Sequence, residues 1–111
     1  MASALYIMRY VGREGMGGGA MYVGHGIISG VDVGEGRYDG TYTEEGGRLR
    51  LEAKMVFPAG GALVTGQQVP PGYSVDLSAD WPVNFADGQP QPISVAGQPV
   101  HVSFQKLRDL P

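Results

Sequence analysis

The chain has 111 residues, of which 42% are hydrophobic and 17% charged, and this excludes a disordered chain and suffices for one domain spanning residues 1–111. The net charge is −3 and the eight basic residues are scattered, so the chain has no positive patch for gripping a nucleic-acid backbone. Nineteen glycines and eight prolines exclude a helical bundle, because both residue types destabilise helix interiors.

Short segments with alternating polarity follow one another along the chain. The clearest runs from 48 to 57, where apolar side chains alternate with arginine, glutamate and lysine, and the same pattern returns from 73 to 81. Glycine, proline or acidic turn residues bound the shorter segments. We expect about eight strands, at approximately 6–10, 19–23, 26–33, 37–43, 48–57, 73–81, 92–96 and 100–105.

The connections between these segments are mostly short. Gly24-His25, Gly46-Gly47 and Asp87-Gly88 are predicted to form tight hairpin turns. Residues 15–20 match a dinucleotide-binding G-x-G-x-x-A pattern, but no segment capable of forming a helix follows, so we predict a flexible hairpin loop there.

No amphipathic helix is expected anywhere, because apolar residues never recur at helical spacing over ten or more positions. The predicted fold class is all-β: an antiparallel up-and-down barrel of about eight strands, lipocalin-like or calycin-like. Short sequential connections favour the barrel, and a two-sheet sandwich stays open as an alternative.

The sequence contains no constellation typical of catalysis. His25 and His101 are far apart in sequence, and no serine lies in a nucleophile elbow. Asp32, Glu35 and Asp39 do not have the spacing of a calcium loop, so we predict a turn with an acidic rim. We therefore expect no catalytic residue, no metal, no cofactor and no enzymatic activity.

Aromatic and apolar side chains on the predicted inward faces are candidates for lining a ligand cavity. Tyrosine combines an apolar ring with a polar tip, which suits a small amphipathic ligand. A solidly filled core is the alternative, and a cavity of about 300 Å³ or more would favour ligand binding. The candidates are Tyr6, Met8, Tyr10, Tyr38, Tyr42, Leu51, Met55, Phe57, Tyr73, Leu77, Trp81 and Phe104.

The absence of cysteine favours a reducing compartment. The N-terminal residues show neither the pattern of a signal peptide nor an apolar membrane-spanning stretch. We expect a cytoplasmic protein without membrane association.

The first half of the chain resembles the GrlR-like family of type III secretion regulators. The resemblance rests on a G-x-G hairpin and Gly-x-Asp strand end within 24–32, a Tyr-x-Gly-x-Tyr strand at 38–42, a turn at 46–49 and an opening strand at 6–10. It implies a lipocalin-like barrel, a homodimer and a negative regulator that binds a transcriptional activator. Gly30 and Gly40 would let strands coil sharply, and Asp32 would accept hydrogen bonds from turn amides.

The family's acidic contact run is represented here only by Glu44 and Glu45, which we take as candidate partner contacts. The expected function is a non-enzymatic regulatory protein that acts through protein contacts. The alternative is a carrier or sensor that binds a small apolar or aromatic ligand inside the barrel.

Overall fold

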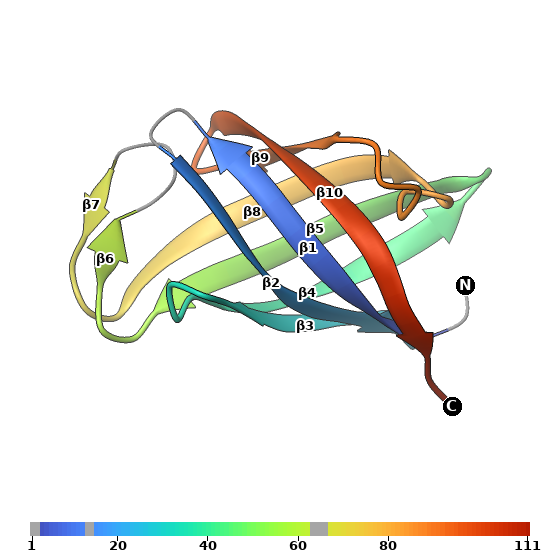
Figure 1. Ribbon diagram of the computed structural model, residues 1–111, viewed down its shortest axis with the longest axis horizontal. Coiled ribbons are helices and arrows are strands. Elements are labelled where there is room, and N and C mark those ends of the chain that lie inside the picture. Colours follow the sequence, from blue (N-terminus) through green and yellow to red (C-terminus); the bar gives the residue numbers. More distant parts are fainter. Residues whose placement is uncertain (1–2, 13–14, 63–66) are drawn as a thin grey trace.

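The structure, a computed structural model, describes residues 3–12, 15–62 and 67–111, and in these ranges every regular element is a strand (Figure 1). Eight strands form the main sheet: β1 (Ala4–Gly12), β2 (Gly15–Gly24), β3 (Ile27–Asp32), β4 (Arg37–Glu45), β5 (Arg48–Phe57), β8 (Tyr73–Pro82), β9 (Gln91–Val95) and β10 (Gln98–Asp109). A short second sheet pairs β6 (Gly61–Ala62) with β7 (Gln68–Val69).

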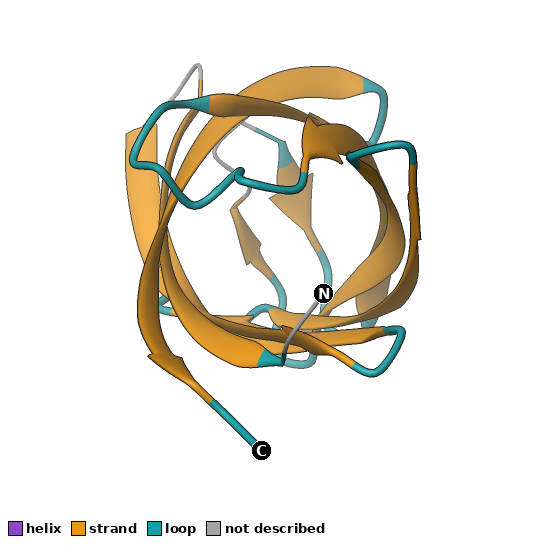
Figure 2. Cartoon of the chain, turned by 90° about the vertical axis from the view of Figure 1, so that its right-hand side faces the viewer, coloured by secondary structure: helices purple, strands orange, loops and turns teal. Residues whose placement is uncertain are grey.

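The eight long strands close into an antiparallel barrel in the order β1-β10-β9-β8-β5-β4-β3-β2. Each strand pairs with its predecessor in the sheet, and pairing of Ala4–Val11 with His101–Asp109 closes the ring. Figure 2 looks along the barrel and shows the strands encircling one interior. The predicted up-and-down barrel is confirmed, and the sandwich alternative is excluded.

The predicted flexible loop over residues 15–20 is wrong, because β2 begins at Gly15. Glycines in β2 and β3 let neighbouring side chains and strands pack closely. A Cβ atom on Gly17 would lie 2.6 Å from the ring of Tyr10, so only glycine leaves room for that ring. A Cβ on Gly30 would lie 2.5 Å from the carbonyl oxygen of Ala20, so glycine there lets β2 and β3 approach closely.

Two of the three predicted turns need correction. Gly46-Gly47 has the expected positive φ angles, 60° and 76°. The β2–β3 turn is centred on His25-Gly26 (φ 51° and 78°), one residue later than predicted. Asp87-Gly88 is not a hairpin turn, because only Gly88 has a positive φ and Asp87 forms an isolated bridge with Gln105.

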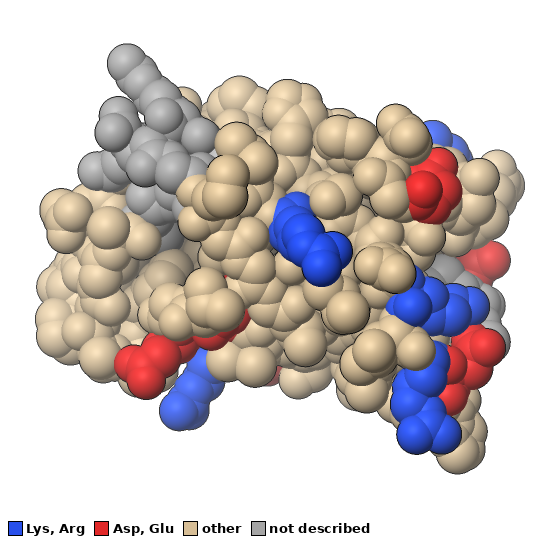
Figure 3. Space-filling view, viewed as in Figure 1, with Lys and Arg blue, Asp and Glu red and all other residues tan. Residues whose placement is uncertain are grey.

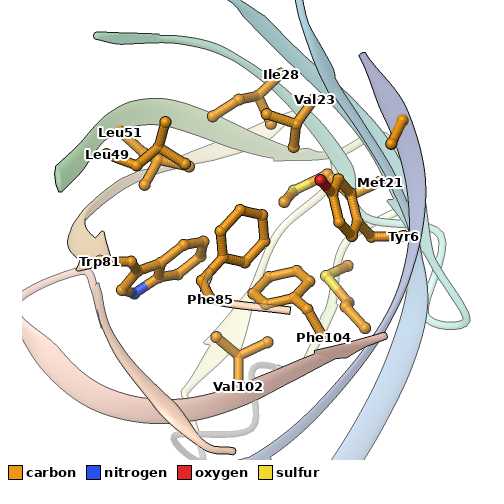
Figure 4. Packing of buried hydrophobic residues seen from close by; sticks show 12 residues of the cluster. Tyr6, Met21, Val23, Ile28, Leu49, Leu51, Trp81, Phe85, Val102 and Phe104 are labelled. Carbon is orange, nitrogen blue, oxygen red and sulfur yellow. The ribbon is translucent and has the colours of Figure 1, made fainter. Parts of the chain in front are cut away.

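The rings of Tyr6, Trp81, Phe85 and Phe104, here called the aromatic plug, fill the end of the barrel where β1 begins and β10 ends (Figures 1 and 4). Phe85 enters from the β8–β9 connection, is 0% exposed, and forms a triangle of rings with Trp81 and Phe104, with its centroid 5.3 Å from each and theirs 5.0 Å apart. The Trp81 Nε1–H donates to the Pro92 carbonyl oxygen at 2.7 Å. This bond supplements a β8–β9 ladder in which only Leu77 and Ser78 are paired.

Charged residues lie on the outside of β5 and β8. Arg48 Nε is 2.9 Å from Asp80 Oδ1, and Lys54 Nζ is 2.9 Å from Asp76 Oδ1. Both pairs are exposed, so each contributes about 0–1 kcal/mol. Their main consequence is to favour this register, which turns Leu49, Leu51 and Met55 inward.

Phe85→Ala is expected to reduce the free energy of unfolding by about 3–5 kcal/mol, because it removes a fully buried ring and leaves a cavity. Urea unfolding followed by circular dichroism measures the change. The matched control is Val83→Ala in the same connection, where the side chain is 38% exposed. If Phe85→Ala lowered the free energy of unfolding no more than Val83→Ala does, the packing role assigned to Phe85 would be contradicted.

Candidate functional site

An apolar cavity of about 100 Å³ lies inside the barrel. Side chains from all eight barrel strands surround it, with Gly34 from the β3–β4 turn and Ala62 from β6 at the end opposite the termini. The cavity therefore runs from the aromatic plug toward that opposite end. The other lining residues are Met8, Tyr10, Met21, Ile28, Asp32, Tyr38, Leu51, Ala53, Met55, Phe57, Leu77, Ser78, Ala79, Trp81, Ile93, Val95, Val100, Val102 and Phe104.

Nine of the twelve predicted cavity residues line this space, and three do not. Tyr6 lies in the aromatic plug, where its ring centroid is 5.1 Å from that of Phe85. Tyr42 is half-buried against the same cluster. Tyr73 begins β8, where its hydroxyl accepts a bond from Gln67 at 3.5 Å. The prediction that these three tyrosines line the cavity is wrong, because inward alternation does not reveal depth along the barrel axis.

The cavity is smaller than the 300 Å³ that would favour a drug-sized ligand. An apolar cavity of about 150 Å³ in another protein binds benzene, so roughly one ring is the appropriate scale here. The interior is thus neither solidly filled nor a large calyx. Any occupant must be small or must displace side chains.

Asp32 forms the one polar centre of the cavity lining. This carboxylate is 8% exposed. Its Oδ1 accepts from the backbone N–H groups of Gly34 and Gly36, both at 2.9 Å. Its Oδ2 accepts from the hydroxyls of Tyr38 at 2.6 Å and Tyr10 at 3.1 Å. Four donors thus occupy the roughly four acceptor positions of a carboxylate.

Local sequence explains how Asp32 is held. It ends β3, and the two turn amides that follow reach back to its side chain, as predicted from the Gly-x-Asp strand end. Gly36 is buried, and a Cβ there would lie 3.0 Å from Asp32 Oδ2 and 3.2 Å from the Phe57 ring. A larger residue at 36 would therefore have to displace the carboxylate or the Phe57 ring by a few tenths of an ångström.

The two tyrosines bonded to Asp32 are held in their neutral form. Burial raises the pKa of Tyr10 to about 12, with the Asp32 charge and hydrogen bond adding to the effect. Burial, followed by the hydrogen bond to Asp32 and its charge, raises the pKa of Tyr38 far above the ordinary value. A phenol with a raised pKa stays protonated at neutral pH, so neither tyrosine is available as a general base in this state.

The remaining candidate residues stay outside the cavity. Glu35 and Asp39 are exposed, so they do not converge with Asp32, and in the described ranges no cluster of possible metal ligands occurs. Glu44 and Glu45 are exposed at the end of β4, beside the Gly46-Gly47 turn. Glu45 lies opposite Arg48 in the ladder.

Sequence reasoning missed several residues of the site. Ile93 and Val95 line the cavity from the short strand β9, and Val100 lines it from the beginning of β10, where the alternation is weak. Ala62 comes from β6, whose two residues give no detectable period. The pairing of Tyr10 and Tyr38 with Asp32 was also missed, since the three lie on different strands. The inward position of each tyrosine beside the Gly-x-Asp strand end was the available signal.

Comparison of the chain with protein-family models, curated proteins and solved structures found no match. Across the described residues, no helix is long and apolar enough to cross a membrane.

Stability is expected to fall as the pH rises from 10 to 12, because the pKa of Tyr10 is about 12 when folded against 10.0 ordinarily. The folded state then holds a proton that the unfolded chain releases, so stabilisation present in full below pH 10 is lost as pH rises through 12. Tyr38→Phe should lower stability at neutral pH by roughly 2 kcal/mol and flatten the alkaline loss. Urea unfolding at several pH values measures both effects.

The matched control is Tyr22→Phe, because the hydroxyl of Tyr22 forms no hydrogen bond with another described residue. It should reproduce the wild-type pH profile. An identical profile for Tyr38→Phe and wild type would contradict the assigned hydrogen bond.

Proposed function

We propose that this protein is a non-catalytic binding protein that holds a small apolar molecule in its barrel interior. The occupant is about the size of one aromatic ring. The single observation that carries this proposal is the cavity of about 100 Å³ between the aromatic plug and Asp32. Protein interiors are ordinarily close-packed, so an apolar void of this size in the centre of a barrel supports a binding role.

The lining suits such an occupant. Met8, Met21 and Met55 border the cavity, and the flexible thioether side chain adapts to ligands of differing shape. Trp81 and Phe104 offer aromatic faces at the plug end. An apolar ring would replace lost dispersion contacts along these walls without leaving polar groups unpaired.

The absence of catalysis is part of the same proposal. Asp32 is already bonded to four donors, and its tyrosine partners hold their protons tightly. His25 and His101 are both exposed and do not line the cavity. No described group in the cavity is therefore poised to act as nucleophile or base.

Toluene is expected to bind wild-type protein and raise its melting temperature, with a change in the fluorescence of Trp81, the single tryptophan. Ala79→Leu should abolish both effects, because Ala79 lines the cavity and three added carbons would fill much of it. Thermal unfolding and fluorescence titration make the measurement.

Ala59→Leu is the matched control, since it adds the same atoms at an exposed position. It should bind toluene as the wild type does. If toluene affects neither the melting temperature nor the fluorescence of the wild type, the proposed function fails.

A second candidate function, contact with another protein, is favoured by the outer surface of β1, β2 and β3. Val11, Met16, Val31 and Val33, here called the outer apolar face, are each at least half exposed. Val11 pairs with Met16 across β1 and β2, and the Val33 N–H donates to Gly18 of β2. Figure 3 shows one basic side chain near the middle of the front of the molecule, with most other charged side chains toward its right-hand side and lower edge. Clustered exposed apolar side chains support a protein contact.

The partner that we propose for the outer apolar face is a second copy of the chain. An apolar surface with few charges is complementary to itself, as a two-fold interface requires. A homodimer agrees with the expectation from the GrlR-like resemblance. The regulatory role itself, with Glu44 and Glu45 contacting a transcriptional activator, rests on that resemblance and stays a proposal.

Wild-type protein is expected to sediment as a dimer, and Val31→Lys should weaken the dimer by about tenfold or more, because it places a charge in an apolar interface. Sedimentation velocity over a concentration series measures the dissociation constant. Thr41→Lys, an exposed substitution on β4, is the control and should leave dimerisation unchanged. A wild type that stays monomeric at every concentration would contradict the proposal.

A further inference from the structure

Asp32, Tyr10 and Tyr38, here called the Asp32 centre, make one part of the cavity lining polar. Tyr10 and Tyr38 both line the cavity and both donate their hydroxyl proton to Asp32 Oδ2. A tyrosine oxygen that has committed its proton can only accept a further hydrogen bond. Any polar group that reaches these two oxygens from the cavity must therefore be a donor.

Within the described residues, no cation of the protein pairs with this centre. No lysine or arginine of the described chain forms an ion pair with Asp32, and the ion pairs that occur lie on the outside. Among the residues lining the cavity, Asp32 is the single carboxylate, and none is a lysine, arginine or histidine. Burial raises the pKa of Tyr10 and of Tyr38, and the Asp32 charge adds to both shifts.

Aromatic rings lie beside the Asp32 carboxylate in the cavity lining. The rings of Tyr10, Tyr38 and Phe57 belong to the lining near Asp32, and the electron-rich face of such a ring attracts cations. An ammonium group placed between the tyrosine oxygens would gain both hydrogen bonding and charge attraction. Its apolar remainder would extend toward Trp81 and Phe104.

We propose that the barrel selects small apolar amines, with the ammonium group donating to the Tyr10 and Tyr38 hydroxyl oxygens in front of the Asp32 carboxylate. This inference rests on the proposed function, because it specifies the chemical class of the ligand held in the same cavity. The polarity of the centre excludes carboxylates and other acceptor-only head groups. It discriminates among ligands of one size by charge and by hydrogen-bond direction.

Three probes with one ring and different head groups test the proposal: benzylamine, benzyl alcohol and benzoate. Affinities for wild-type protein are measured through Trp81 fluorescence and checked by thermal shift. Benzylamine is expected to bind at least about tenfold more tightly than benzyl alcohol, and benzoate is expected not to bind. Equal affinity for benzylamine and benzyl alcohol, or tighter binding of benzoate, would overturn the inference and leave the proposed function standing. If none of the three and no toluene binds, both fail.

Two variants test whether the preference for benzylamine depends on the Asp32 centre. Asp32→Asn keeps an acceptor for the turn amides but removes the charge and presents a donor to the tyrosines, so the preference for benzylamine over benzyl alcohol should disappear. The control Asp39→Asn also removes one carboxylate charge, but at an exposed position on β4, and it should leave the preference for benzylamine unchanged. If circular dichroism shows that Asp32→Asn does not fold, Tyr38→Phe replaces it and should reduce the preference severalfold. A full preference retained in the folded Asp32 variant, or in Tyr38→Phe, would overturn the assignment.

Discussion

Closure of the sheet between β1 and β10 is the constraint on which the rest of the molecule depends. These strands come from opposite ends of the chain, and Ala4 lies opposite Asp109. Their pairing satisfies backbone groups that would otherwise form two exposed edges. It also fixes which side chains face inward on all eight strands. The cavity, the aromatic plug and the Asp32 centre follow from that single closed register.

The two ends of the interior differ in chemistry. At the end near the termini, Phe85 folds inward from a connection and fills the barrel against Trp81 and Phe104. Toward the other end, the charged Asp32 is held by two turn amides and two tyrosine hydroxyls. Burial of that charge is tolerated because every acceptor position is occupied. An apolar cavity with one polar centre is the result, and it gives the interior a direction.

Inside and outside offer different kinds of recognition. The interior supports selection by size and by head group, whereas the outer apolar face on β1, β2 and β3 supports contact with a surface of similar character. The two proposals are compatible, since one concerns inward and the other outward side chains of the same strands. Alternation along a strand makes both possible in a chain of 111 residues.

Most barrel strands and their inward faces could be predicted from the sequence, because alternating polarity, clearest along 48–57 and 73–81, allows only one face of a strand to be buried. The contact of Asp32 with its turn amides could also be predicted, since it is local. The contacts of Tyr10 and Tyr38 with Asp32, the place of Tyr6 in the plug and the strand over the glycines from 15 to 19 were visible only in the folded structure. These features depend on strand register and on depth along the barrel axis. Register and depth arise from contacts between residues far apart in the chain, which alternation along one strand does not encode.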